Sequence, residues 1–270
     1  MVVQHNMQAA NANRMLGMNV KAVAKSTEKL SSGYKVNRAA DDAAGLSISE
    51  KMRNQIRGIN QAVSNSEDGQ YLIQTAEGNM NEIHSILQRM GELATKAAND
   101  VNDTDDREAI QKEINQLASE INSISSKAQF NGKYLLDGTE TALKLQVGAN
   151  EGENMTITLD EITSATLQVN ALDMSDHGNA AAAMTKITEA VKTVSDKRSM
   201  MGAIQNRLDY TINNLENYSE NLTSSESNIR DTDMAKEMVN YSKNNILQQA
   251  AQSMLAQANQ SNQGVLSLLQ

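Results

Sequence analysis

Apolar residues recur along most of this chain at steps that alternate between three and four. The longest uninterrupted run lies between residues 73 and 97, and its members are Ile73, Ala76, Met80, Ile83, Leu87, Met90, Ala94 and Ala97. Two further runs follow the same rule, one from Ile110 to Ala128 and one from Met184 to Ile229. This alternation is typical of the heptad seam of a coiled coil or helical bundle.

The three runs predict helices at about residues 46–98, 105–128 and 180–228. At about 1.5 Å per residue the first helix would extend roughly 80 Å and the last roughly 70 Å. Compact domains of ordinary size do not need helices of this length. We therefore expect a mostly α fold in which residues 46–228 form a long antiparallel bundle, a coiled-coil rod whose three helices share one apolar seam.

The hydrophobic period changes to two between the second and third predicted helices. The segments "LKLQVG", from Leu143, and "MTITLD", from Met155, alternate apolar and polar residues, and "ANEGEN" separates them. This arrangement predicts a small β-hairpin within about residues 131–175. Upstream, the loop "NDVNDTDD" ends the first rod helix and supplies caps for the second, with Asp105 three residues before Glu108 as a capping pair.

The two ends of the chain differ from its middle in charge. No acidic residue precedes Glu28, no charged residue follows Lys243, and the last 27 residues contain eleven Asn or Gln. An apolar stripe continues through this C-terminal part, and its candidate self-assembly residues are Leu247, Ala251, Met254, Leu255, Leu266 and Leu269. A frayed polar tail is one interpretation. Helical periodicity favours another, in which terminal helices at residues 1–32 and 234–270 pair and bury their remaining apolar surface against other copies.

Two breaks separate these terminal segments from the rod, at residues 33–45 and 229–233. The candidate connector residues of the first break are Gly33, Arg38, Asp41, Asp42 and Gly45. Gly33 permits a backbone conformation that a helix does not use. Either aspartate can cap the helix that follows, and Thr232 or Asp233 can do so at the second break. We expect the breaks to let the terminal helices leave the rod at a new angle.

Composition agrees with narrow helical seams. The chain has one Phe, no Trp and no Pro, whereas thick cores usually contain more aromatic residues. The absence of cysteine excludes disulfides and thiolate chemistry, and the net charge of −9 argues against nucleic acid as a partner. The chain contains no run of 18 apolar residues, so no segment is predicted to insert into a membrane. The N-terminus lacks the apolar core and cleavage site of an ordinary signal peptide.

No group of residues indicates catalysis or a cofactor. The histidines at positions 5, 84 and 177 are not at metal-ligand spacing, and no H-E-x-x-H motif is present. The carboxylates between Asp100 and Glu108 do not match an EF-hand, and capping explains them better than calcium binding. We therefore expect no enzyme activity, no metal and no cofactor.

Four segments resemble bacterial flagellin. They are "STEKLSSGYKVNRAADDAAGLSISEKMRNQIRGINQA", "LIQTAEGNMNEIHSILQRM", "SENLTSSESNIRDTDMAKEMV" and "MLAQANQSNQGVLSLLQ". The resemblance covers roughly residues 1–135 and 180–270, and the short centre resembles a minimal form without large outer domains. It implies that the terminal helices of many subunits form an inner tube around a channel. The rod helices would form a second shell, and residues 33–45 would connect the two layers.

The same resemblance implies the partners and the location of the chain. The partners would be further copies of itself, hook–filament junction and filament cap proteins, an export chaperone and the flagellar export apparatus. The location would be the extracellular filament, reached through the flagellar channel without a cleaved signal peptide. A junction protein between hook and filament, or a secreted coiled-coil effector, are the alternatives.

One further segment, "LQRMGELATKAAND", resembles the part of many flagellins that binds the Toll-like flagellin receptor of animal hosts. The matching positions are Arg89 and Leu93, with Glu113 on the next helix. Gly91 stands where the family usually has a basic residue, and its place after the seam residue Met90 predicts that it points outward.

Overall fold

The computed structural model describes residues 6–268, with side chains up to Ser261. The chain divides into two compact units. The terminal unit comprises Met1–Asn54 and Asn221–Gln270, and the central unit comprises Gln55–Glu220. Helices α2 (Ala43–Ala97) and α4 (His177–Arg230) contribute residues to both units, so the boundaries between the units lie inside these long helices.

The central unit is an antiparallel bundle built from parts of α2 and α4 and from α3 (Thr104–Lys127). Every member of the apolar run from Ile73 to Ala97 is fully buried. Ile110, Ile114 and Ile121 of α3 join the same core, whose members lie between residues 72 and 208. The predicted fold class, a long helical bundle with a small hairpin and paired terminal helices, is therefore confirmed.

The start of α3 differs from the expected capping pair. Asp103 is the N-cap residue, and its carboxylate accepts a hydrogen bond from the backbone N–H of Thr104 at 2.7 Å. Asp105 and Asp106 lie in the first turn, where a negative charge is stabilised by the helix dipole. The helix begins one residue before the predicted start because Asp103 already satisfies the capping requirement.

Two hairpins follow α3. Strands β1 (Gln129–Phe130) and β2 (Lys133–Tyr134) are joined by Asn131 and Gly132, which both have positive φ. Positive φ at both turn residues matches the right-handed twist of such hairpins. The larger hairpin is the predicted one, and pairs β3 (Ala142–Gln146) with β4 (Asn154–Thr158). Its inward residues alternate as expected: Leu143 and Leu145 are half-buried, and Met155 and Ile157 are buried.

The irregular segment between β4 and α4 is held against α3 by side-chain amides. Gln111 donates to the carbonyl of Leu172 and accepts from the N–H of Met174, both at 2.8 Å. Asn122 accepts from the N–H of Ser164 at 2.9 Å. These bonds satisfy backbone groups that no strand partner reaches, so the segment can cover the core without regular structure.

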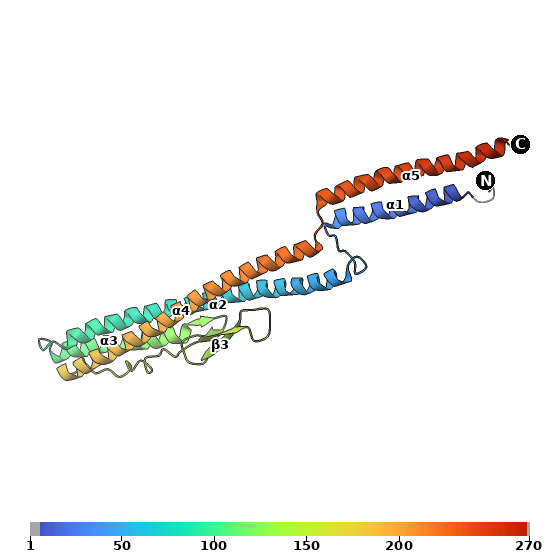
Figure 1. Cartoon of the computed structure of the whole chain (residues 1–270). Coiled ribbons are helices and arrows are strands. Elements are labelled where there is room, and N and C mark those ends of the chain that lie inside the picture. The colour runs from blue at the N-terminus through green and yellow to red at the C-terminus, as the bar shows by residue number, and fades with distance from the viewer. Residues whose placement is uncertain (1–5, 269–270) are drawn as a thin grey trace. The chain divides into compact units, whose positions relative to one another are not determined.

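In the terminal unit, helices α1 (Met7–Ser32) and α5 (Met234–Leu268) run antiparallel, side by side (Figure 1). Asn19 donates to the carbonyl of Leu247 at 3.2 Å, and Asn6 donates to that of Ala258 at 3.0 Å. Gly33 ends α1 in the left-handed conformation, with φ of 77°. Within residues 6–268, no helix combines the length and the apolar character needed to cross a membrane.

Candidate functional site

The contact between α1 and α5 is narrow. Within the described part of these two helices, Ser26 alone is fully buried, and the other facing residues are half-exposed. Much apolar surface therefore remains uncovered. The large apolar side chains left 44–74% exposed are Met7, Met15, Met18, Val20, Met234, Met238, Val239, Ile246, Leu247 and Met254. An exposed apolar surface of this kind marks an interaction site in a protein that buries its core elsewhere.

The predicted self-assembly residues fall on two faces of α5. Leu247 and Met254 are 45% and 64% exposed, so they are available to a partner. Ala251 and Leu255 are half-buried in the contact with α1. Leu266 and Leu269 lie outside the residues whose side chains the structure describes.

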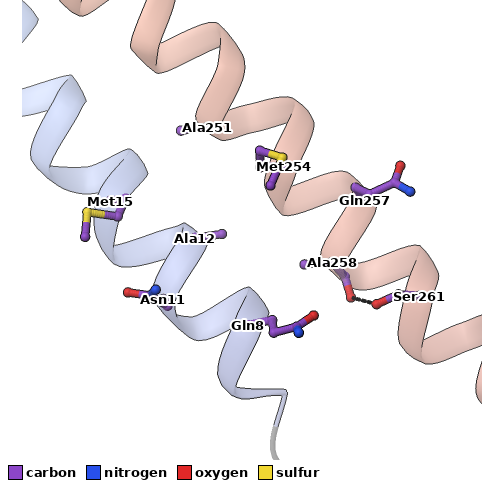
Figure 2. Close-up of a pocket in the computed structure, with 9 residues that line it drawn as sticks. All are labelled: Gln8, Asn11, Ala12, Met15, Ala251, Met254, Gln257, Ala258 and Ser261. Carbon is purple, nitrogen blue, oxygen red and sulfur yellow. Dashed lines mark hydrogen bonds between the residues drawn. The ribbon is translucent and has the colours of Figure 1, made fainter.

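A groove of about 510 Å³ runs between the two helices. Figure 2 shows its lining, which comes from both of them: Gln8, Asn11, Ala12, Met15, Ala251, Met254, Gln257, Ala258 and Ser261. Each of these side chains is either apolar or polar without a charge. The groove therefore offers apolar surface and amide hydrogen-bonding groups to a partner, without the cost of desolvating a fixed charge.

The first connector is organised by its two aspartates. Asp42 accepts from the N–H of Gly45 at 2.9 Å and so caps α2. A Cβ at residue 45 would collide with that carboxylate, which explains the glycine. Asp41 instead accepts from the N–H of Arg38 at 3.2 Å and pairs with Lys25 at 2.8 Å. The bond from Lys25, followed by that from the Arg38 backbone, holds the pKa of Asp41 below its ordinary value.

The two connectors meet in a short backbone bridge. Tyr34 pairs with Asp231, and the N–H of Thr232 donates to the carbonyl of Gly33 at 2.8 Å. Arg230 lies over the ring of Tyr34, 4.5 Å from its centroid, and forms an ion pair with Glu50 at 3.2 Å. A cation over an aromatic ring is attracted by the negative face of the ring. These contacts tie the start of α2 and the end of α4 to the terminal helices of the same unit.

In the second connector, one of the two predicted residues caps α5. Asp233 accepts from the N–H of Lys236 at 3.1 Å and caps α5. The hydroxyl of Thr232 is buried and has no hydrogen-bond partner among the described residues. Arg38 pairs with Glu28 of α1 at 2.9 Å, on the exposed side of the first connector.

The residues of the predicted receptor segment lie together on α2 and α3. Arg89 pairs with Glu113 across the two helices at 3.0 Å and with Glu92 on its own helix at 3.0 Å. The hydrogen bonds to Glu92 and then Glu113 raise the pKa of the Arg89 guanidinium above its ordinary value. Arg89 and Glu113 border a cavity of about 470 Å³ that also includes Leu93, Lys96 and Asp106.

The other two members of this segment are less exposed than Arg89 and Glu113. Leu93 is 4% exposed and belongs to the core, so it supports the surface from below. Gly91 is half-buried, and a Cβ there would lie 3.7 Å from Ile187 of α4, in ordinary contact. Gly91, which directly follows Met90, therefore lies at the edge of the contact between α2 and α4, because α4 covers that side of α2.

Comparison with known proteins identifies the family. The model of the bacterial flagellin N-terminal helical region matches residues 3–141, and that of the C-terminal helical region matches residues 184–269. The chain belongs to the bacterial flagellin family. As a flagellin, it is a structural subunit of the flagellar filament.

Similar flagellins align with this chain over its full length. One from Halalkalibacterium halodurans is 53% identical over 271 residues, and one from Bacillus subtilis is 47% identical over 303 residues, with both chains covered completely in each case. A crystal structure of Bacillus cereus flagellin has a TM-score of 0.50 at 33% identity, covering 56% of this chain and 88% of that one. A putative flagellar hook-associated protein from Vibrio parahaemolyticus has a TM-score of 0.60 at 14% identity, covering 71% of this chain and all of that one, which shows a shared fold.

Sequence reasoning on this flagellin missed two groups of residues. The first is the set of contacts that Arg230 makes with Tyr34 and Glu50, because Arg230 is far from both in sequence. The second is the set of exposed methionines on α1, because the charge-free C-terminus carries the more regular apolar stripe. A signal for them was present: Met7, Met15 and Met18 lie in the charge-poor N-terminal segment that precedes the first acidic residue.

Proposed function

We propose that this flagellin polymerises through its terminal helix pair. The observation that carries the proposal is the exposed, methionine-rich apolar surface on α1 and α5, at chain ends with no acidic residue before Glu28 and no charged residue after Lys243. Burying a large apolar side chain fully contributes about 1.5–3 kcal/mol, so several such residues per subunit supply a substantial driving force. Methionine is well suited to such packing because its flexible side chain fits irregular gaps.

The same surface suits an inner layer of the filament. Terminal helices lining a channel with Asn, Gln and Ser would present few fixed charges to a chain in transit. The central unit would then form the outer shell, and the filament would lie outside the cell after export through the flagellar channel. The export chaperone and apparatus, the hook–filament junction proteins and the cap are the partners that this route requires.

Electron microscopy of the purified chain tests polymerisation. We expect long filaments from this protein alone, seeded by short filament fragments. A junction protein would instead need a second protein to extend beyond a short assembly, and a secreted coiled-coil effector would form no filament. The fold shared with a hook-associated protein does not separate these cases, whereas filament length does.

We also propose that the surface around Arg89 and Glu113 binds the Toll-like flagellin receptor. Both side chains remain accessible, at 52% and 45% exposure, and their ion pair borders a cavity. A charged pair at such a surface can exchange its partner for one on a receptor. Leu93 would act by supporting this surface and not by direct contact.

Binding titrations with monomeric protein test the receptor proposal. Arg89→Ala should weaken binding, while Arg53→Ala should not, although Arg53 also pairs with a glutamate three residues away on α2, at 3.2 Å. Gly91→Arg should strengthen binding, since it restores a cation and its Cβ fits against Ile187. Equal loss in both alanine variants would contradict the proposed surface.

A further inference from the structure

Most methionines in the described residues are either exposed or buried, and only Met52 and Met184 are half-buried. Seven of those in the described residues are 44–74% exposed: Met7, Met15, Met18, Met200, Met234, Met238 and Met254. Five are at most 4% exposed: Met80, Met90, Met155, Met174 and Met201. All of the buried ones lie in the central unit. All of the exposed ones except Met200 lie on α1 and α5, the helices proposed to join subunits.

The exposed thioethers are the groups that a mild oxidant such as a hydroperoxide reaches first. The chain has no cysteine, which would otherwise compete for the oxidant. The sulfur lone pair attacks the terminal peroxide oxygen, the O–O bond breaks as the S–O bond forms, and a proton shift releases water or an alcohol. Sulfur loses two electrons and the peroxide gains them.

Oxidation changes the property on which assembly depends. A sulfoxide turns a flexible apolar side chain into a polar one and disrupts methionine-rich interfaces. Met15 and Met254 line one groove from opposite helices, so two oxidised side chains would enter the same contact (Figure 2). The core of the central unit would not be affected, because its methionines are buried.

We propose that the methionines of α1 and α5 form an oxidation site that stops polymerisation of the free subunit while its central unit stays folded. This inference rests on the proposed assembly through the terminal helices. Once subunits have joined, the same methionines are covered and the filament resists the oxidant. The subunit is therefore sensitive before assembly and protected after it.

The test treats monomer and finished filament with the same concentration of hydrogen peroxide. Peptide mass spectrometry should find sulfoxide on α1 and α5 in the monomer, and far less in the filament. Oxidised monomer should need a roughly tenfold higher concentration to polymerise, which corresponds to about 1.4 kcal/mol per subunit. Methionine sulfoxide reductases of both stereochemical classes should restore assembly.

Two variants make the assignment specific. Replacing all six terminal methionines by leucine keeps their size and apolar character, so this variant should polymerise with or without peroxide. Met200→Leu removes the exposed methionine of the central unit and should remain as sensitive as the natural chain. If the six-leucine variant polymerises before peroxide but not after it, or if oxidised natural monomer polymerises normally, the oxidation site is refuted. If untreated natural protein forms no filaments, the proposed function fails and this inference fails with it.

Discussion

At the scale of single residues, two adjacent positions on α5 differ in exposure. Met254 is exposed, whereas Leu255 is half-buried against α1. The apolar stripe therefore serves one contact inside the subunit and one available to a partner. Sequence periodicity alone could not distinguish the exposed position from the half-buried one, because both residues fit an apolar helical face.

Aspartate substitutions at these two positions should have different effects on the monomer. Leu255→Asp replaces a half-buried apolar side chain of the α1–α5 contact by a carboxylate, and burying a charge without a partner is costly. We expect faster amide hydrogen exchange in both helices and no filaments. Met254→Asp should also prevent filaments but leave monomer exchange unchanged, and Met254→Leu should preserve both. Normal polymerisation of Met254→Asp would show that its face is not buried in the filament.

Asp41 predicts how the first connector responds to acid. Its pKa lies below the ordinary aspartate value of about 3.9, first because of the hydrogen bond from Lys25. The stabilisation from the charged carboxylate is therefore fully present above that ordinary value and is lost as pH falls through the lowered pKa. Carboxyl NMR titration should show the low pKa, and Lys25→Gln should raise it. Lys21→Gln, a neighbouring change of the same kind, should leave it unaltered.

At the scale of elements, the heptad pattern predicted the helices because they follow from local periodicity and share one seam. The docking of the β3–β4 hairpin on α2 was not predictable in this way. It depends on glycines of α2 that contact residues far along the chain: Gly58 faces Ala149, and Gly69 faces Leu145. From the sequence alone, a glycine inside a helical pattern predicts only a less stable helix. Its role in packing can be recognised only once the position of the hairpin is known.

Alanine substitutions on α2 should separate docking glycines from merely tolerated ones. A Cβ at Gly58 would approach the Cβ of Ala149 to 2.9 Å and its Cα to 3.4 Å. Gly58→Ala should therefore destabilise the central unit by about 1–3 kcal/mol through overpacking. Gly78 has open space at the same position, so Gly78→Ala should stabilise the helix by about 0.5–1 kcal/mol. Urea unfolding measures both, and equal effects would mean that the hairpin does not rest on α2.

At the scale of the whole molecule, the buried core and the helices proposed to join subunits lie in different segments. The buried core lies between residues 72 and 208, within the central unit. Helix α5 contributes none of its residues up to Ser261 to this core and instead pairs with α1. The loss of charge beyond Lys243 predicts a separate assembly segment, since a charge-free apolar stripe needs a partner that the rod seam does not supply.

Deletion of residues 247–270 should therefore abolish filaments without unfolding the central unit. The truncated chain loses Leu247, Met254 and the lining that α5 gives to the groove, but keeps every member of the core. Circular dichroism should still show a cooperative thermal transition, because cooperativity comes from packing of the central helices. The helical signal before the transition should be smaller, since α1 also loses its partner. Seeds of natural filament should not elongate with the truncated chain. Abundant filaments from it would place the driving force for assembly in the central unit, and loss of the thermal transition would show that the terminal pair is needed for folding itself.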